Sequence, residues 1–324
     1  MEAGTATVKG GGTAAPGGGE KRGISTLGKV VIALAVYFGL MVALVVIFGA
    51  SGTENEDFKP QEEFKLEPWI PIHIGGIDMS INKAVLYLFL ACGATCYAMV
   101  YVAKRMMTRP NRVQTAVEAA YDLTANTMTR ENIADSKLAG RWFAFIATVF
   151  FFLWFSNIIG FIPLPINSAE SVDIFGIAFP SFALYAATAN ISVPLVLTLI
   201  VWFSYHIEGV RKKGLFGYLK SWVPAGITGF TAVPIFFIEA LSHFVRLISL
   251  SARLFANMLA GHLLILIMGG GMAVLLGLAY IGVATLPIAV AFYIFEVGLV
   301  ASLQAFIFAI LSAIYLGGAV ADEH

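Results

Sequence analysis

The chain has 324 residues, of which 59% are hydrophobic and only 12% are charged, and its mean hydropathy is +0.84. Soluble globular domains carry about 25% charged residues, so the composition excludes an ordinary soluble domain and indicates an integral membrane protein. The formal net charge is zero, which argues against a nucleic-acid partner and makes the placement of the charges informative.

The first 26 residues are rich in glycine, with Gly triplets at 10–12 and 17–19. These triplets lack the flanking strand and the Lys-Ser/Thr pair of a phosphate-binding loop, so residues 1–26 are predicted to be a disordered leader. The apolar segment 27–50 follows a basic region, as a signal sequence does. It has about 20 apolar residues and no clear small-x-small cleavage site, which favours a permanent membrane anchor.

Five more apolar segments follow this anchor. Three are close to the ~20 residues that a bilayer requires, and they cover 82–103, 143–163 and 181–205. Two are longer, 235–268 and 272–316, and the second carries a single proline, Pro287.

The connections between these segments alternate in charge. Segments 51–80 and 165–180 are acidic, whereas basic residues precede the first helix and follow the second and the fourth. By the positive-inside rule the basic connections are cytoplasmic. The pattern predicts six membrane helices with both termini inside, an extracytoplasmic segment at 51–80 and a short cytoplasmic tail at 319–324. Residues 113–137 are polar yet helix-permissive, which suits an amphipathic connector on the cytoplasmic face.

Segment 235–268 is too long for an upright membrane helix. About 34 residues at ~1.5 Å each would reach ~51 Å, whereas the hydrocarbon core is ~30 Å thick. The helix must tilt by roughly 50°, well beyond the usual ~20°. The last segment is also overlong. The sequence therefore predicts an all-α integral membrane protein with about six membrane helices, the last two forming a long, strongly slanted hairpin that turns at 269–271.

Arg253 lies near the middle of segment 235–268 with no acidic residue within about a dozen positions. A guanidinium keeps its proton in proteins, and holding that charge at bilayer depth costs between ~2.5 and ~17 kcal/mol, so an intramembrane arginine indicates a functional role. The alternative is an arginine that snorkels to the interface or pairs with a distant carboxylate; its central position favours the functional role.

Other polar residues share a helical face with Arg253, because they recur every three or four positions. The residues are Glu239, Ser242, His243, Arg246, Ser249, Arg253 and Asn257, followed by Gly261. A polar stripe inside a membrane faces a protein partner or a water path.

Two titratable residues lie beyond this stripe. His262 is nine positions after Arg253, which at ~100° per residue places it on the opposite side of the helix and ~13 Å along it. It is either a structural imidazole or a proton relay. Glu296 interrupts the last apolar segment, as does Gln304. A lone intramembrane carboxylate pairs, stays protonated or relays protons.

The two cysteines, Cys92 and Cys96, lie four positions apart in an apolar segment and far from any histidine cluster. Neither a zinc site nor a disulfide framework is supported. We expect no metal and no cofactor.

Three stretches resemble subunit a of the F-type ATP synthase: EALSHFVRLISLSARLFANMLAGH (239–262), LQAFIFAILSAIYL (303–316) and FSNIIGFIPLP (155–165). Weaker similarity extends the match over residues 80–318. The resemblance implies a proton-channel domain at 81–318 that is not catalytic alone: the stator subunit of a rotary ATP synthase, with two half-channels for ions, most simply protons. It implies a multi-pass position in a bacterial plasma membrane. The implied partners are the c-subunit ring, the b subunits of the peripheral stalk, other ATP synthase subunits and membrane lipid.

The resemblance also implies roles for particular residues. Arg253 would face the c ring with Asn257 and Gln304 beside it, and His262 and Glu296 would line an aqueous access path. Further residues implied for the access path are Glu239, His243, Arg246, Ser249, Asn157 and Asn190.

The sequence departs from the family pattern in three places. Glu296 lies eight positions before Gln304 where the family has seven, which turns its face by ~100° unless a π-bulge absorbs the extra residue. Asn190 and Ser192 stand where relatives commonly have Asp and Asn, which would alter the access channel. The helix at 27–50 precedes the usual start of the fold.

Two other classes of protein are alternatives: a secondary transporter or ion channel, and an intramembrane enzyme. A secondary transporter or ion channel would use Arg253 to bind an anionic substrate and the hairpin to gate access, and it predicts an internal repeat. The sequence has no such repeat. An intramembrane enzyme needs a nucleophile or metal constellation such as His-Glu-x-x-His, and the sequence has none.

Overall fold

The computed structural model describes residues 26–48, 64–104 (except 67, 75, 76 and 79), 111–174, 177–271 (except 225 and 228) and 279–321. The predicted leader lies outside the described residues except for its last position. The chain divides into two units, Met1–Ala50 and Ser51–His324. The described part of the first unit is helix α1 (Thr26–Phe48), which lies over segment 27–50, the predicted anchor.

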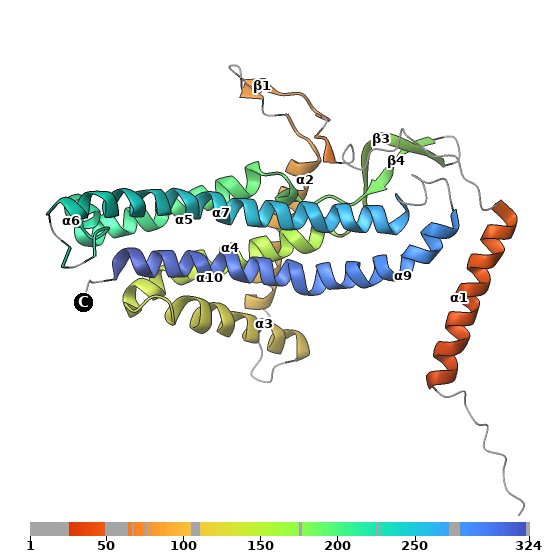
Figure 1. The fold of residues 1–324 in the computed structure, drawn as a ribbon, viewed down its shortest axis with the longest axis horizontal. Coiled ribbons are helices and arrows are strands. Elements are labelled where there is room, and N and C mark those ends of the chain that lie inside the picture. The colour runs from red at the N-terminus through yellow and green to blue at the C-terminus, as the bar shows by residue number, and fades with distance from the viewer. Residues whose placement is uncertain are drawn as a thin grey trace, which may run out of the picture. The chain divides into compact units, whose positions relative to one another are not determined.

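The second unit is a bundle of helices (Figure 1). Its α-helices are α2 (Lys83–Lys104), α3 (Arg112–Asp122), α4 (Ser136–Gly160), α5 (Ser192–Lys213), α6 (Leu215–Lys220), α7 (Ala232–Leu266), α9 (Ala279–Phe295) and α10 (Ala301–Val320). π-Helical stretches η2 (Leu123–Arg130), η5 (Ile267–Gly271) and η6 (Glu296–Val300) continue α3, α7 and α9, and short 3₁₀ turns η3 (Ala187–Ala189) and η4 (Gly229–Thr231) precede α5 and α7.

Five helical stretches among the described residues are long and apolar enough to cross a membrane. They start at Lys83, Ser136, Ser192, Gly229 and Ile281, and the last two extend over 41 and 40 residues. The predicted class, a helical integral membrane protein, is confirmed. The sequence predicts α1 as a sixth membrane helix; its apolar part, Val31–Leu40, is shorter than a membrane span, and its position in the membrane stays a prediction.

The last two stretches form the expected hairpin. α7 has 35 residues, which at ~1.5 Å each makes it ~52 Å long, well above the ~30 Å of a hydrocarbon core. Figure 1 shows α9 and α10 returning beside α7 in the opposite direction. The predicted turn at 269–271 is wrong, because η5 keeps the chain helical through Gly271. Glycine weakens a helix but does not oblige it to end.

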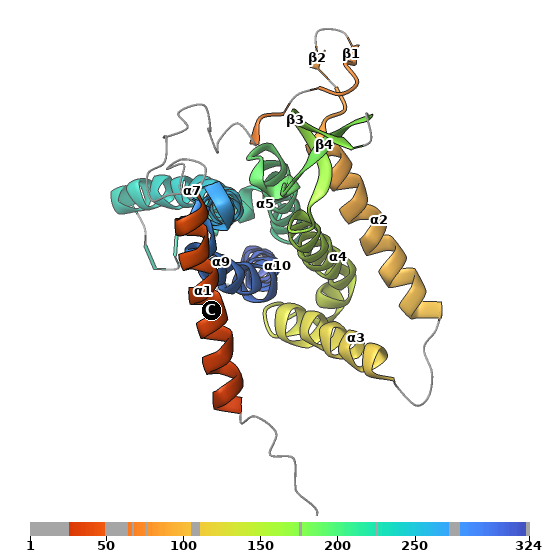
Figure 2. The same ribbon diagram turned by 90° about the vertical axis from the view of Figure 1, so that its right-hand side faces the viewer.

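Two β-hairpins were not predicted. β1 (His73–Ile74) pairs with β2 (Ile77–Asp78), and β3 (Leu164–Ile174) pairs with β4 (Ile177–Ala183), both antiparallel. Both belong to the segments whose acidic charge predicts an extracytoplasmic position, and Figures 1 and 2 show both hairpins near the same end of α2.

The predicted helix at 181–205 begins eleven residues too early, because α5 starts at Ser192 and continues to Lys213. The preceding residues end β4 and form η3, with Tyr185, Ala186 and Ala187 almost completely buried. An apolar run cannot distinguish a buried irregular segment from a membrane helix. Gly214 then ends α5 at a φ of 74°, a left-handed conformation that glycine adopts without strain.

The core of the bundle depends on small residues of α10. Ala301, Ala305, Ala309 and Ala313 recur every fourth position and are all 0% exposed. Such a row lets neighbouring helices approach closely, as is typical of membrane bundles. Phe308 and Leu316 fill the space toward α4 and α5, together with Leu153 and Leu254 from α4 and α7.

The predicted connector at 113–137 is helical, as α3 and η2. Asn111 caps its start by accepting from the backbone of Gln114, and Asp135 caps α4 in the same way. The backbone N–H groups of Leu138 and Lys137 hold the pKa of Asp135 below its usual range. Gly317 of α10 packs against the backbone of Asn132, which ties the connector to the end of the bundle.

Candidate functional site

Arg253 points away from the bundle. Its side chain is exposed, whereas Leu250 and Leu254 on the other side of α7 are 2% and 0% exposed. Within the described part of the chain, no carboxylate forms an ion pair with Arg253. A fixed positive charge on the outer surface of a membrane helix needs a partner, and the described part of this chain does not provide one.

The surface around Arg253 consists of small and polar residues. Ser249, Ala256 and Ala260 are exposed with it, and Asn257 is half-buried. Small residues of this kind allow another helix to approach the α7 backbone closely.

Gln304 faces inward from α10. It is 5% exposed, and its amide nitrogen has no hydrogen-bond partner among the described residues. A buried donor of this kind costs free energy unless something satisfies it, so Gln304 is suited to contact water or another polar group within the membrane.

The π-helix η6 resolves the spacing between Glu296 and Gln304. Eight residues of α-helix rotate by ~800°, which is ~80° past two full turns. A π-helix closes i→i+5 bonds and accommodates one extra residue. The rotation about the helix axis from Glu296 to Gln304 is therefore that of seven α-helical residues, ~700° or nearly two turns. η6 begins at Glu296, and both Glu296 and Gln304 are buried. The π-bulge that the spacing required is present.

This register leads to a deletion prediction. Removing Gly298, which is exposed and has open space around it, should convert η6 to α-helix and preserve the common face of Glu296 and Gln304. We expect the activity of this deletion variant to stay within roughly tenfold of the wild type, because a helix rotates ~100° per residue and only a deletion at the bulge leaves the phase intact. Deleting Ile314 from the α-helical part of α10 is the control and should abolish assembly. Equal damage from both deletions would contradict the register argument.

Glu296 lies against Gly261 of α7. A Cβ atom at position 261 would be 2.6 Å from Glu296 Oε2 and 3.0 Å from Oε1, so the carboxylate occupies the space that the glycine leaves. Glu296 Oε2 is buried and has no hydrogen-bond partner in the described chain.

His262 points to a different neighbour. It is 1% exposed and stacks on Phe161 at a centroid distance of 4.5 Å. Its Nδ1 lies 2.9 Å from the Met258 carbonyl oxygen and its Nε2 lies 3.0 Å from that of Gly160. Gly261 therefore lies against Glu296 across the hairpin, and both nitrogens of His262 face backbone carbonyl groups and not the carboxylate.

Asn157 belongs to the same end of the bundle. Its amide nitrogen donates to the Ala301 carbonyl at 3.3 Å, and its Oδ1 accepts the Thr188 hydroxyl at 3.0 Å. Asn190 instead accepts from the backbone N–H of Ser192 at 3.0 Å, so it organises the start of α5. Burial raises the pKa of the nearby Tyr185.

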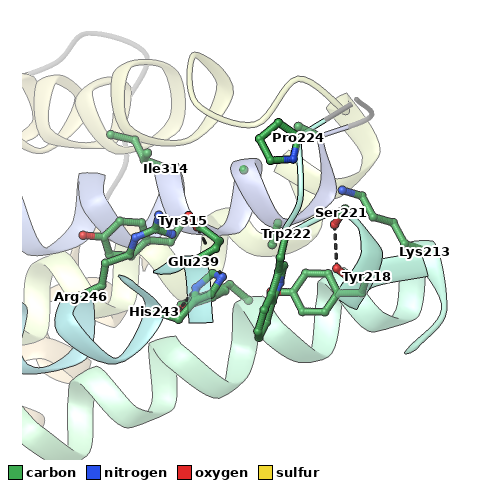
Figure 3. A pocket seen from close by; sticks show the side chains of 14 residues that line it. Lys213, Tyr218, Ser221, Trp222, Pro224, Glu239, His243, Arg246, Ile314 and Tyr315 are labelled. Carbon is green, nitrogen blue, oxygen red and sulfur yellow. Dashed lines mark hydrogen bonds and ion pairs between the residues drawn. The ribbon is translucent and has the colours of Figure 1, made fainter. Parts of the chain in front are cut away.

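A second polar region lies at the other end of α7, around a cavity of about 600 Å³ (Figure 3). α5, α6, α7 and α10 all contribute to its wall. Its polar lining includes Glu239, His243 and Arg246 from α7, Tyr205 and Lys213 from α5, and Tyr218 from α6.

The polar groups of this cavity are coupled. Arg246 donates to Glu239 Oε1 at 3.1 Å, and His243 Nε2 lies 3.8 Å from the same oxygen. The Arg246 guanidinium also lies over the Tyr315 ring at 5.5 Å. Glu239 therefore forms the centre of a charged cluster that is open to the cavity.

The two polar regions are offset along α7. Glu239 and Gly261 are 22 positions apart, which corresponds to ~33 Å of helix. Arg253 lies between them, ~21 Å from Glu239 and ~12 Å from Gly261 along the axis. Neither polar region contains Arg253.

The structure thus separates the predicted residues into three places. Glu239, His243 and Arg246 line the cavity; Glu296, His262 and Asn157 lie at the opposite end; Arg253 and Ser249 are on the outer surface between them. The sequence pattern does not single out His206, Tyr205 and Tyr218 in the first region or Thr188 and Tyr293 in the second. Only proximity in the fold identifies them. The polar residues of α5 and α6 do not recur along the length of the helix at three- or four-residue spacing as those of α7 do. Within the described residues no three His, Cys, Asp or Glu side chains could hold a metal ion.

Comparison with known proteins gives a consistent family. The family profile described as "ATP synthase A chain" matches residues 85–317. The match includes α7, α9 and most of α10 and leaves out α1.

Individual relatives agree. The chain is 33% identical to ATP synthase subunit a of Paramagnetospirillum magneticum over 264 residues, 81% of this chain and 98% of that protein. It is 34% identical to the protein of that name from Bradyrhizobium diazoefficiens over 82% of this chain and 98% of that one, and 35% identical to the one from Rubrobacter xylanophilus over 77% and 88%.

Proposed function

The chain belongs to the ATP synthase A chain family, and from this premise we propose that Arg253 is the fixed charge past which a rotor carboxylate moves. As a family member the chain is a subunit of the membrane sector of a bacterial ATP synthase, multi-pass in the plasma membrane, with ion transport as its role and no catalytic activity of its own. The family membership removes the transporter alternative.

The observation that carries the proposal is the position of Arg253. It is exposed on α7, has no carboxylate partner in the described chain, and lies between two polar regions ~33 Å apart. A charge of this kind requires an acidic group on another protein. The partner we propose is a ring of c subunits, each bearing one membrane carboxylate.

The mechanism follows from electrostatics. A rotor carboxylate crosses lipid only in its neutral form, because burying the ion is prohibitive. Beside Arg253 the ionised form is favoured, so the carboxyl group releases its proton into one polar region. After the ring advances, the carboxylate takes a proton from the other region. Arg253 also repels protons and blocks direct leakage between the two regions.

The two polar regions are the proposed half-channels. Glu239, His243 and Arg246 would connect the cavity to the cytoplasm, and Glu296, Asn157 and His262 would form the other path. Asn257 would flank the rotor carboxylate beside Arg253, and Gln304, which is buried in the bundle, would act on it through water or another polar group. Other proposed contacts are the b subunits of the peripheral stalk and lipid around the exposed apolar faces.

Orientation can be checked by cysteine labelling of sealed cells in which Cys92 and Cys96 have been replaced. A cysteine at Asp173 in β3 should react with a membrane-impermeant thiol reagent, and one at Lys213 at the end of α5 should be protected until the membrane is opened. Labelling of the Lys213 position alone in intact cells would reverse the proposed assignment of the cavity to the cytoplasm.

The partner can be tested by purification. A tagged chain extracted in mild detergent should retain a ring of small two-helix proteins, identified by mass spectrometry of the intact complex. If the tagged chain purifies with other synthase subunits but never with such a ring, the proposed partner of Arg253 is wrong.

A further inference from the structure

We propose that His206 of α5 is a proton-holding residue of the cavity path, acting as a pair with His243. The inference rests on the proposed function of the cavity as the cytoplasmic half-channel. His206 does not itself line the cavity, and it is not one of the site residues predicted from the sequence.

The two imidazole rings are in direct contact. Their centroids are 4.8 Å apart with an edge-to-face angle of 61°. Both rings also pack against Trp222 of the segment after α6, at 6.0 Å from His206 and 4.8 Å from His243. These aromatic contacts hold the two rings together, and Figure 3 shows Trp222 and His243 at the wall of the cavity.

Each histidine has a tyrosine hydroxyl at Nδ1. Tyr218 OH lies 2.7 Å from His206 Nδ1, and Tyr205 OH lies 3.1 Å from His243 Nδ1. Burial raises the pKa of Tyr218, so that hydroxyl keeps its proton and can donate to a neutral imidazole or accept from a protonated one. Both tyrosines line the cavity, which gives His206 a connection to its water.

The Nε2 atom of His206 is buried and has no hydrogen-bond partner among the described residues. A neutral His206 that accepts the Tyr218 hydroxyl at Nδ1 carries its proton on this unsatisfied nitrogen. The corresponding atom of His243 faces the Glu239 carboxylate at 3.8 Å. The pair therefore has one nitrogen that no described residue satisfies and one that is directed at the acidic residue of the path.

The charges facing the pair limit it to one proton at a time. Arg246 of α7 is the fixed cation beside it and Glu239 the anion; Tyr315 of α10 and Lys213 of α5 complete the titratable lining. Glu208 on α5 is already engaged by Arg141 and Arg211. Two imidazolium rings in contact beside Arg246 would repel each other. A proton accepted by His206 is thus passed through the hydroxyls of Tyr218 and Tyr205, which meet at the cavity, to His243 and then to Glu239, and His206 returns to its neutral form.

The test is the pH dependence of ATP-driven proton pumping by the whole complex in inverted membrane vesicles, where the cytoplasmic face is outside. With the external pH varied from about 6 to 9, across the range in which histidine titrates, pumping falls at alkaline pH when proton uptake becomes limiting. His206→Gln should move the half-maximal pH of this fall downward by about half a unit, within the roughly one-unit spread of histidine pKa values in proteins.

Three variants make the result decisive. His73→Gln, which removes a histidine from β1, should leave the profile unchanged. Tyr218→Phe keeps the ring but removes the hydroxyl, and should reproduce the downward shift; it decides the question if His206→Gln does not assemble. Arg253→Ala should not pump at any pH, and pumping by that variant would refute the proposed function itself. Only the role of His206 is refuted if Arg253→Ala is inactive and His206→Gln has the wild-type pH profile. If His206→Gln does not assemble, the pH profile of Tyr218→Phe is used instead.

Discussion

Replacing Arg253 by lysine should reduce ion-driven ATP synthesis by at least about a hundredfold, the order of effect seen when one fixed electrostatic group is removed from a preorganised site. Lysine has the same sign of charge, but its ammonium is a strongly hydrated point charge whose pKa falls readily when it is desolvated. A guanidinium cannot lose its proton in this way. We expect the carboxylate of the rotor to be left without a permanent counter-charge.

The measurement is ATP synthesis by membrane vesicles after an acid–base transition, with the amount of assembled complex determined in parallel. Assembly should be nearly normal, because Arg253 is exposed and makes no ion pair in the described chain. Arg130→Lys, in the connector η2, is the matched control and should synthesise ATP normally. Near-normal synthesis by Arg253→Lys would remove the argument that the charge must be permanent.

Placing a methyl group at Gly261 should reduce synthesis by about tenfold or more, since displacement of a catalytic group by about 1 Å can cost on the order of a hundredfold. The new Cβ would be 2.6 Å from Glu296 Oε2, so the carboxylate must move. The atom that moves is the end of a flexible side chain, and Ala stabilises a helix relative to Gly by about 0.8–1.0 kcal/mol. The defect should therefore appear in function and not in folding.

A compensating change provides the check. Glu296→Asp shortens the side chain by one methylene group and should restore part of the activity in the Gly261→Ala background, although it impairs the wild type. Gly93→Ala in α2, where nothing lies within 4 Å of the added Cβ, is the control for an alanine in a membrane helix. If Gly261→Ala is as active as this control, the carboxylate of Glu296 does not depend on the space at position 261.

The sequence predicts the membrane helices well because the physical signal is simple. Spanning length and hydropathy identify α2, α4 and α7 to within a few residues. The exception is the start of α4, because the charges of Lys137 and Arg141 lower the hydropathy of its first two turns. The start of α5 is misplaced because buried apolar residues such as Tyr185 and Ala186 look the same in sequence whether they are helical or not.

The site is only partly accessible from sequence. Arg253 and the stripe on α7 follow from spacing and the cost of an intramembrane charge. Arg246 and Arg253 are seven positions apart and share nearly one face, yet Tyr315 covers the first and no part of the described chain covers the second. That difference depends on α10, and helix periodicity cannot show it. The spacing between Glu296 and Gln304 does indicate that a π-bulge is needed, and η6 provides it. His206 is less predictable still, since its importance comes from contacts between helices.

The central claim is that the face of α7 carrying Arg253 meets a ring of small subunits. It is tested most directly by disulfide cross-linking in whole membranes, after replacement of Cys92 and Cys96. Ala256→Cys is exposed beside Arg253, and Phe89→Cys is 68% exposed on α2, on the other side of the bundle from α7 (Figure 2). With one cysteine placed at mid-membrane in the ring subunit, oxidation should link it to position 256 and not to position 89. A link to position 89, or none to position 256 in active membranes, would contradict the account.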